Sequence, residues 1–198
     1  MENKSSNNPV NWAFLKKNNA CTEGLTWWKK NCENLSTDKQ LLKLIEVRAD
    51  WANWLMVRIL SKENKIRYAI YAAEQVLHIF EEKYPTDNRP REAILQAKKV
   101  LENNSKKNKN AYTDIYPDAA YTKAAEAAAD AAYAAYEAAY AVYANADAAY
   151  AADAAAYAVY ANNADAYPDN YTAKKTLQLK IINYGISLFE EEINNVSS

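Results

Sequence analysis

Residues 119–166 read AAYTKAAEAAADAAYAAYEAAYAVYANADAAYAADAAAYAVYANNADA, and this stretch decides the fold. It holds 27 Ala, 8 Tyr and 6 Asp or Glu, with Lys123 as its one basic residue and neither Gly nor Pro. Alanine has the highest intrinsic helix propensity, and the two strongest helix breakers are absent. The composition therefore predicts an almost wholly helical segment.

Six tyrosines recur along the stretch at the spacing of one seam of a heptad repeat. Their steps are 3, 4, 3, 7 and 7 residues, with Asp147 and Ala154 in the skipped places. These residues, called the Tyr ridge, are Tyr133, Tyr136, Tyr140, Tyr143, Tyr150 and Tyr157. Because a single methyl group buries little apolar surface, we expect tyrosine rather than alanine to supply the adhesion of this helix.

Three acidic side chains flank the Tyr ridge. At 100° per residue, Glu126, Asp130 and Glu137 lie about 20 to 60° around the helix from the ridge. Ridge and acidic flank together would suit a basic protein surface. The alternative is internal packing, in which the tyrosines close a thin core or pair two copies of the chain into a homo-oligomer.

A helix through the whole stretch would be too long for a compact chain. From residue 118 to 161 it would extend about 66 Å, against a diameter of roughly 40 Å for a globular chain of this length. The pattern Tyr-Ala-Val-Tyr-Ala-Asn occurs twice, ending at Asn145 and Asn162. Since Asn and Asp favour turns and N-caps, we predict a break within residues 162–170. Asn145 is a second candidate, with a tolerated mid-helix Asn as the alternative.

The chain of 198 residues contains two Gly and five Pro, which is too few for a set of hairpins. We therefore predict an all-α fold, a multi-helix bundle with a long Ala/Tyr-rich helical region folded back on itself. The polar run at residues 103–111 predicts a linker. It separates an N-terminal Trp-rich helical bundle, residues 1–102, from residues 112–198, which hold the Ala/Tyr-rich region and a C-terminal amphipathic helix. We expect the two parts to pack as one unit.

The N-terminal part carries most of the tryptophan. Four of the five Trp lie between Trp27 and Trp54, so we expect the densest part of the core there. Thr37 and Gln40 have the spacing of a capping box at a helix start.

Three further helices follow from apolar periodicity and from proline. The pattern over residues 61–84 predicts one amphipathic helix, which Pro85 ends. Pro90 is placed to begin the next helix. Residues 174–193 predict the last helix, where Gly185 would allow another helix to come close.

Charge and cysteine content bound the compartment and the partners. The net charge is −1, and the Ala/Tyr-rich stretch carries −5, which leaves +4 outside it. Such a balance does not indicate direct nucleic-acid binding. Cys21 and Cys32 have no zinc-site spacing, so we expect free, partly buried thiols in a reducing cytosol. The N-terminus does not resemble a secretory signal, and no uncharged apolar run reaches 18 residues, so we expect a cytoplasmic protein without a membrane span.

Catalytic constellations are scarce. His78 is the single histidine, and Glu74 and Glu82 stand four residues to either side of it. This spacing could hold a divalent metal, but it is also that of an ordinary surface histidine between acids, which we favour. Gly-rich phosphate loops, CxxC pairs and HExxH motifs are absent. We expect no enzyme, no metal site and no cofactor.

Two arginines flank Pro90. Arg89 and Arg91 could grip a carboxylate or a phosphate, because a guanidinium group makes bidentate contacts. In the alternative, they fix a helix turn to Glu81 and Glu82.

Residues 67–94 resemble the signature of an immunity protein family of bacteria and bacteriophages, of the polymorphic-toxin type. The pattern is Ala-Glu-x-Val-Leu, then Phe-Glu-x-x-Tyr-Pro-x-Asp-x-Arg-Pro-Arg and Ala-Ile, followed by an Ala-rich helical C-terminal region. The matching positions are Ala73, Glu74, Val76, Leu77, Phe80, Glu81, Tyr84, Pro85, Asp87, Arg89, Pro90, Arg91, Ala93 and Ile94. Residues 19–27 and 179–186 are similar to phage-encoded members in particular.

The resemblance implies a non-catalytic inhibitor, because immunity proteins bind and block a cognate toxin, often a nuclease. Our first hypothesis is an immunity or counter-defence protein that neutralises a toxin or a host defence effector by stoichiometric binding through the Tyr ridge and its acidic flank. The alternative is a phage sponge that sequesters a nucleotide-type immune signalling molecule. Tyrosines would then stack on bases, and Arg89, Arg91 or lysines would hold phosphates. Either protein would act in the cytoplasm of the bacterial host cell.

Overall fold

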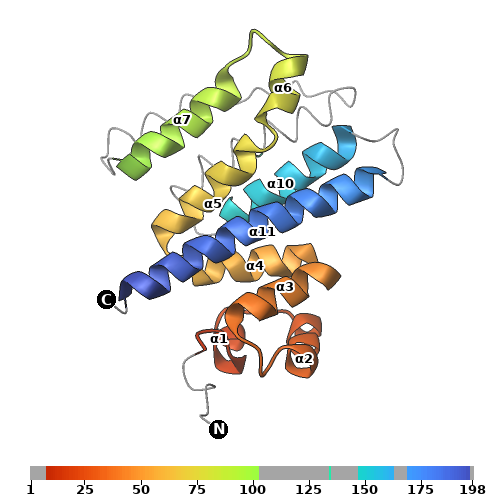
Figure 1. Ribbon diagram of the computed structural model, residues 1–198, viewed down its shortest axis with the longest axis vertical. Coiled ribbons are helices and arrows are strands. Elements are labelled where there is room, and N and C mark those ends of the chain that lie inside the picture. The colour runs from red at the N-terminus through yellow and green to blue at the C-terminus, as the bar shows by residue number, and fades with distance from the viewer. Residues whose placement is uncertain (1–7, 103–133, 135–146, 163–168, 197–198) are drawn as a thin grey trace.

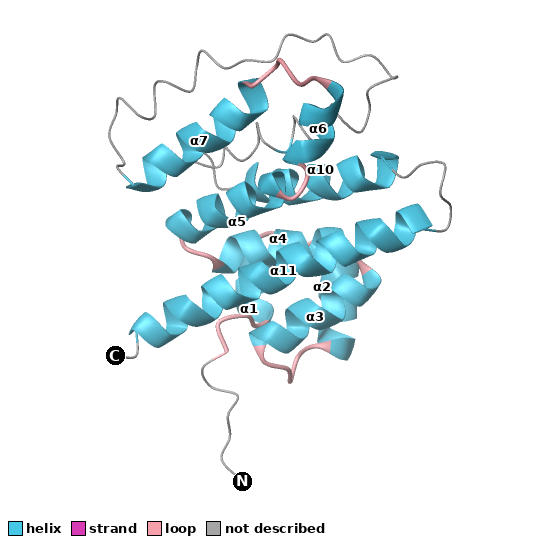
Figure 2. Cartoon of the chain, turned by 45° about the horizontal axis from the view of Figure 1, so that its top comes forward, coloured by secondary structure: helices cyan, strands magenta, loops and turns pink. Residues whose placement is uncertain are grey.

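The computed structural model describes residues 8–102, 134, 147–162 and 169–196 (Figure 1). Every regular element in these ranges is an α-helix (Figure 2), which confirms the predicted all-α fold. In chain order the helices are α1 (Trp12–Lys17), α2 (Thr22–Asn31), α3 (Thr37–Val47), α4 (Ala49–Ile59), α5 (Lys62–Glu74), α6 (Leu77–Lys83), α7 (Arg89–Glu102), α10 (Asp147–Asn162) and α11 (Asp169–Val196). The predicted linker at residues 103–111 lies outside the described residues.

Helix α10 holds a central place among these helices. It packs against α11, α5 and α4, and α11 also packs against α5, α4 and α3. Helix α7 lies along α5, and α1 packs on α2 at the N-terminal end of the molecule (Figure 1). One cluster of buried side chains runs through helices from before residue 102 and after residue 147. The two parts of the chain therefore share a core.

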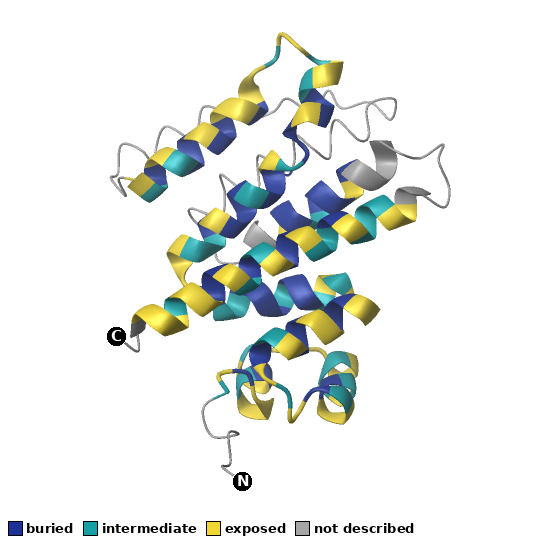
Figure 3. Ribbon diagram, viewed as in Figure 1, coloured by how far each residue is buried: buried dark blue, intermediate teal, exposed yellow. Residues whose placement is uncertain are grey.

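Alanines between residues 150 and 158 form the buried face of α10, which is largely dark blue in Figure 3. The six alanines in this range are at most 7% exposed: Ala151, Ala152, Ala154, Ala155, Ala156 and Ala158. Tyr150 and Tyr157 are 57% and 54% exposed. The prediction that tyrosine supplies the adhesion is therefore wrong for α10. Its methyl groups leave room for α4, α5 and α11, whose larger apolar side chains, such as Met56 and Ile181, fill the shared core.

Helix α11 comes close to both α4 and α5 at Gly185. A Cβ atom at this position would lie 2.8 Å from Met56 Sδ and 2.8 Å from Tyr68 Cε2. Both neighbours are completely buried. The predicted close approach at Gly185 is confirmed, because a side chain there would overlap residues of two other helices.

The predicted capping box of Thr37 and Gln40 is wrong. Thr37 Oγ1 donates to Asn8 Oδ1 at 2.5 Å, and Gln40 Oε1 accepts from Trp28 Nε1 at 2.8 Å. Ser36 is the N-cap residue of α3, and its side chain makes no capping hydrogen bond. Thr37 and Gln40 are buried, so they are used to satisfy polar groups from distant segments rather than the start of their own helix.

The helix predicted over residues 61–84 is divided into α5 and α6. Ser61 caps α5 as a helix start, its Oγ accepting from Asn64 N at 3.3 Å. The helix is interrupted at Val76, where φ is −123° and ψ is −2°. Val76 is completely buried, and the interruption turns α6 away from the line of α5 (Figure 1). A continuous periodic pattern did not reveal this change of direction.

Helices α10 and α11 lie side by side (Figure 1). Helix α10 ends at Asn162 and α11 begins at Asp169, which confirms the predicted break within residues 162–170. Helix α11 extends further at both ends than the predicted range 174–193. The candidate break at Asn145 lies outside the described residues. No helix among those described is both long and apolar enough to cross a membrane.

Candidate functional site

A cavity of about 410 Å³, called the Trp cavity, lies between the N-terminal helices and α10. Trp28 of α2 is buried, Trp51 and Trp54 of α4 are half-buried, and Tyr150 of α10 is exposed. Aromatic surface therefore runs from the floor of the cavity to its rim. The sequence predicted the densest core here, whereas Trp51 and Trp54 leave part of their rings open. The volume is in the range of small-molecule sites.

The floor of the Trp cavity is fixed by buried hydrogen bonds. Trp28 Nε1 donates to Gln40 Oε1 at 2.8 Å, and Gln40 Nε2 donates to the Leu35 carbonyl oxygen at 2.8 Å. Trp27 packs edge-on against Trp51, with ring centroids 6.2 Å apart. Since the buried indole N–H is satisfied and the rings are packed, the wall needs little rearrangement to receive a ligand.

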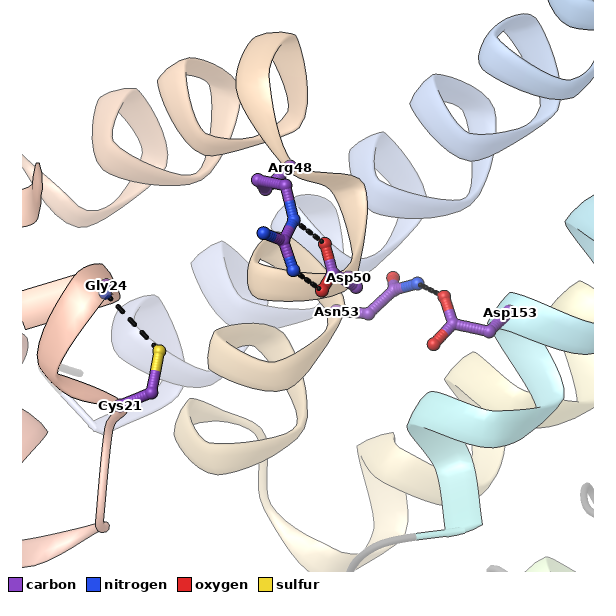
Figure 4. Close-up of polar contacts among 6 residues, drawn as sticks. All are labelled: Cys21, Gly24, Arg48, Asp50, Asn53 and Asp153. Atoms are coloured by element: carbon purple, nitrogen blue, oxygen red, sulfur yellow. Dashed lines mark hydrogen bonds and ion pairs between the residues drawn. The ribbon is translucent and has the colours of Figure 1, made fainter.

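Two arginines stack on the tryptophans of α4. The Arg58 guanidinium carbon lies 3.9 Å from the Trp54 ring centroid, and Arg58 Nη1 donates to the Trp54 carbonyl oxygen at 2.9 Å. The Arg48 guanidinium carbon lies 4.7 Å from the Trp51 ring centroid. Arg48 also donates to both carboxylate oxygens of Asp50, at 2.9 and 2.6 Å (Figure 4). These hydrogen bonds lower the pKa of Asp50, so its carboxylate is ionised. The guanidinium charge of Arg48 balances the negative charge of this carboxylate.

Asp153 is the polar residue of the buried face of α10, and it lines the Trp cavity. Asn53 Nδ2 donates to Asp153 Oδ1 at 2.6 Å (Figure 4), and Tyr68 Oη donates to Asn53 Oδ1 at 2.6 Å. The second oxygen of Asp153, Oδ2, has no hydrogen-bond partner among the described residues. Burial raises the pKa of Asp153, and the charge of Asp50 acts in the same direction, against the Asn53 hydrogen bond and Lys174.

Replacing Asp153 with asparagine is expected to raise the free energy of unfolding at pH 7. Because its pKa is raised, the folded protein binds the Asp153 proton more tightly than the unfolded chain does. The stability linked to this proton is complete below the ordinary pKa of 3.8 and is lost as the pH rises through the raised value. Asparagine stays neutral and keeps an oxygen for Asn53.

Urea unfolding of both proteins between pH 3.5 and pH 7 measures the effect. The difference in unfolding free energy, Asp153→Asn minus wild type, should grow with pH across this range. A difference that does not change with pH would show that the Asp153 carboxyl is not held in a desolvating environment.

Cys21 and Gly24 lie at the side of the Trp cavity formed by α2. Cys21 Sγ accepts from Gly24 N at 3.3 Å and so caps α2 (Figure 4). A Cβ atom at Gly24 would lie 3.2 Å from Cys21 Sγ and 3.9 Å from the Trp51 ring. The absence of a side chain at Gly24 therefore lets Cys21 and Trp51 lie close to the backbone of α2. Cys32 is buried, which raises its pKa. Both cysteines are free, as predicted.

Tyr150 is the predicted binding residue that the structure places at the Trp cavity. Arg91 donates to both carboxylate oxygens of Glu81, each at 2.6 Å, and Arg89 Nη2 donates to Asp87 Oδ2 at 2.6 Å. The Arg91–Glu81 pair supports the alternative in which this arginine fixes a helix turn to a predicted acid, whereas Asp87, the acid that pairs with Arg89, was not predicted. Seven predicted residues lie outside the described residues: Tyr133, Tyr136, Tyr140, Tyr143, Glu126, Asp130 and Glu137.

His78 lies on the exposed side of α6. Glu74, which the metal alternative needs, ends α5 before the interruption of the helix and pairs with Lys98 Nζ at 2.5 Å. Within the part of the chain that the structure describes, no group of three or more His, Cys, Asp or Glu is placed to hold a metal ion.

Trp51, Trp54 and Asp153 were not predicted as site residues. A signal was present, because Trp51 and Trp54 are three residues apart and so share one face of a helix. Asp153 likewise interrupts the alanines of residues 151–156. Tryptophan clusters usually belong to hydrophobic cores, so partial exposure of Trp51 and Trp54 was not expected.

No family model, curated protein or solved structure matches the chain. The chemistry of the Trp cavity therefore follows from its own groups. Its tryptophan rings can stack on a planar ligand, Asp153 Oδ2 can accept a hydrogen bond, and the Arg58 guanidinium carries donors. The described lining residues include no histidine. These groups are suited to binding.

Proposed function

We propose that this protein is a non-catalytic binding protein that sequesters a small organic molecule with a flat aromatic ring. The observation that carries the proposal is the Trp cavity of about 410 Å³, with Trp28, Trp51 and Trp54 in its lining. Aromatic side chains contribute about 1–3 kcal/mol per stacked base. In a bacteriophage, such a protein would act as a sponge that removes a host immune signal in the cytoplasm.

The polar groups of the Trp cavity would give the sponge its selectivity. A ring that stacks on the face of Trp54 opposite the Arg58 guanidinium has Arg58 and Asp153 in the same cavity. One offers hydrogen-bond donors and the other an acceptor, so a heterocycle with both kinds of group on its edge is favoured over a plain hydrocarbon ring. The sponge would then use these residues rather than Arg89 and Arg91, which are held in ion pairs.

The second candidate function is stoichiometric inhibition of a toxin or a host defence effector. The observation that favours it is the exposure of Tyr150 and Tyr157, two tyrosines seven residues apart on α10. Exposed tyrosines on a rigid helix are typical anchors of protein interfaces. In this hypothesis the Tyr ridge and its acidic flank contact a basic protein surface.

The sponge hypothesis predicts that planar heterocycles raise the melting temperature of the wild-type protein, because a ligand that binds only the native state stabilises it. Replacing Trp54 with leucine should weaken the binding of each active compound by about 10- to 100-fold, since a stacking surface is lost. Thermal shift with a panel of nucleosides, nucleotides and nicotinamide derivatives, followed by calorimetry, measures both effects.

Trp12→Leu is the matched control, because Trp12 is partly exposed on α1 and does not line the Trp cavity. It should leave affinity unchanged. A panel without a single stabilising compound, or equal losses in the two variants, would contradict the sponge. Native mass spectrometry of protein purified from infected cells separates the two functions. A small added mass supports the sponge, and a protein complex of fixed stoichiometry that Tyr150→Ser and Tyr157→Ser abolish supports the inhibitor.

A further inference from the structure

A second cavity of about 400 Å³ adjoins the Trp cavity. Asp50 of α4 and Asp153 of α10 line both cavities, so the two cavities are neighbours that share these two residues. Helix α11 forms the far wall of the second cavity, with Lys174 and Lys175. The second space is called the Lys cavity. A ligand that occupied both cavities would pass Asp50 and Asp153.

The two cavities differ in charge. The described lining of the Trp cavity holds Asp50, Asp153 and one cation, Arg58. The Lys cavity holds the same two carboxylates together with Arg48, Lys174 and Lys175. Its formal charge is thus positive, whereas that of the Trp cavity is negative. A protonated Asp153 would remove one negative charge from each cavity and keep the Lys cavity the more positive of the two.

Contacts with neighbouring side chains hold two of the cations that line the Lys cavity. Lys174 Nζ lies 3.6 Å from the centroid of the Tyr157 ring, and Arg48 is held by its bidentate contact with Asp50. A lysine ammonium group carries three donors and binds phosphate as a compact point charge. An anionic group in this cavity would meet charges that are already in position.

We propose that the two cavities form one site for a nucleotide, with the base in the Trp cavity and a phosphate group in the Lys cavity. This inference rests on the proposed sequestration of a planar ligand. It adds that the ligand carries a negatively charged group, and it places that group in the Lys cavity. The base stacks on Trp54, and the phosphate lies between Lys174 and Lys175. The sugar passes the carboxylates of Asp50 and Asp153.

Asp153 further selects the edge of the base. Its Oδ2 oxygen has no partner among the described residues, and an exocyclic amino group of adenine, guanine or cytosine can donate to it. Uracil lacks such an amino group. Uracil would have to donate its ring N3–H instead, so Asp153 requires a base that presents an N–H donor on the edge facing it.

The test compares each nucleoside with its 5′-monophosphate by calorimetry, using the adenine, guanine, cytosine and uracil compounds on the full chain. The 5′-monophosphate of at least one amino-bearing base should bind about tenfold tighter or more than its nucleoside, the gain of a charge-assisted hydrogen bond. Lys174→Gln and Lys175→Gln should each remove most of this gain and leave nucleoside affinity unchanged. Lys180→Gln is the matched control, an exposed lysine on α11 outside both cavities.

The outcomes separate this inference from the proposed function. Equal affinities of nucleoside and nucleotide, or a gain that survives both lysine substitutions, would overturn the inference and leave the sponge intact. If no nucleoside or nucleotide binds but another planar heterocycle does, the inference is wrong and the sponge stands. If no planar compound binds, both are wrong. If Lys180→Gln also removes the affinity gain of the 5′-monophosphate, the gain depends on the net charge of the protein and not on the Lys cavity. This result would also overturn the inference.

Discussion

Replacing Gly185 with alanine is expected to lower the free energy of unfolding by about 1–3 kcal/mol, the cost typical of an overpacked core. The added Cβ would lie 2.8 Å from atoms of both Met56 and Tyr68. Met56 can move its flexible end, but the Tyr68 ring is buried and its hydroxyl is hydrogen-bonded to Asn53. The overlap should outweigh the roughly 0.5–1 kcal/mol that alanine normally gains over glycine inside a helix.

Urea unfolding at pH 7, followed by circular dichroism, measures the change. Gly24→Ala is the matched control, because it makes the same substitution in the chain's other glycine, where the nearest atom to the new Cβ is Cys21 Sγ at 3.2 Å. The loss at Gly185 should exceed the loss at Gly24. A Gly185→Ala variant as stable as the wild type would show that α11 does not cross α4 and α5 as closely as described.

Local preferences were enough to predict the helices but not how they face one another. The alanine content of residues 119–166 predicted a helix, which α10 confirms for residues 147–162, and Asn162 marked its end, because propensity and turn chemistry act within a few residues. Which face of α10 is buried depends on α4, α5 and α11, which come from other parts of the chain. Tyr150 and Tyr157 are therefore exposed to solvent, although tyrosine is the largest side chain in the pattern.

The candidate site could be predicted even less. Asp153 and Asn53 are 100 positions apart, and no local pattern links a polar residue of α4 to one of α10. The Trp cavity exists because α2, α4 and α10 meet around it. Sequence could supply the residue types, such as a Trp pair three residues apart, but not the space between them. The capping-box prediction was wrong for the same reason, because Gln40 accepts a hydrogen bond from Trp28 of a neighbouring helix.

The hydrogen-bonded chain from Tyr68 through Asn53 to Asp153 connects the core to the candidate site. Tyr68 is completely buried and also contacts the Gly185 crossing, whereas Asp153 lines both cavities. Asn53 is the middle member, and its amide supplies both an acceptor and a donor. The position of the Asp153 carboxylate, and with it the polar edge of the site, is thus fixed by residues in the core.

Replacing Asn53 with alanine is expected to lower the free energy of unfolding by about 2–5 kcal/mol at pH 7, since two buried groups lose their partners at once. The Tyr68 hydroxyl would keep a donor without an acceptor, and Asp153 would lose the hydrogen bond that opposes the rise of its pKa. The pKa of Asp153 in the folded variant should therefore rise further. As the pH falls toward 3.8 and Asp153 becomes protonated in both states, the cost should shrink toward that of the Tyr68 hydroxyl alone.

Urea unfolding of wild type and Asn53→Ala at pH 4 and pH 7 tests both the size and the pH dependence of this cost. Asn183→Ala is the matched control, because it makes the same change at an exposed position of α11 and should alter stability by less than about 0.5 kcal/mol. A cost at Asn53 that is equal at both pH values would mean that the Asp153 charge is not part of it. A cost no larger than that at Asn183 would refute the buried chain altogether. If the chain is correct, Asn53→Ala also frees the Asp153 carboxylate from its fixed position, so ligand selectivity at the site should fall together with stability.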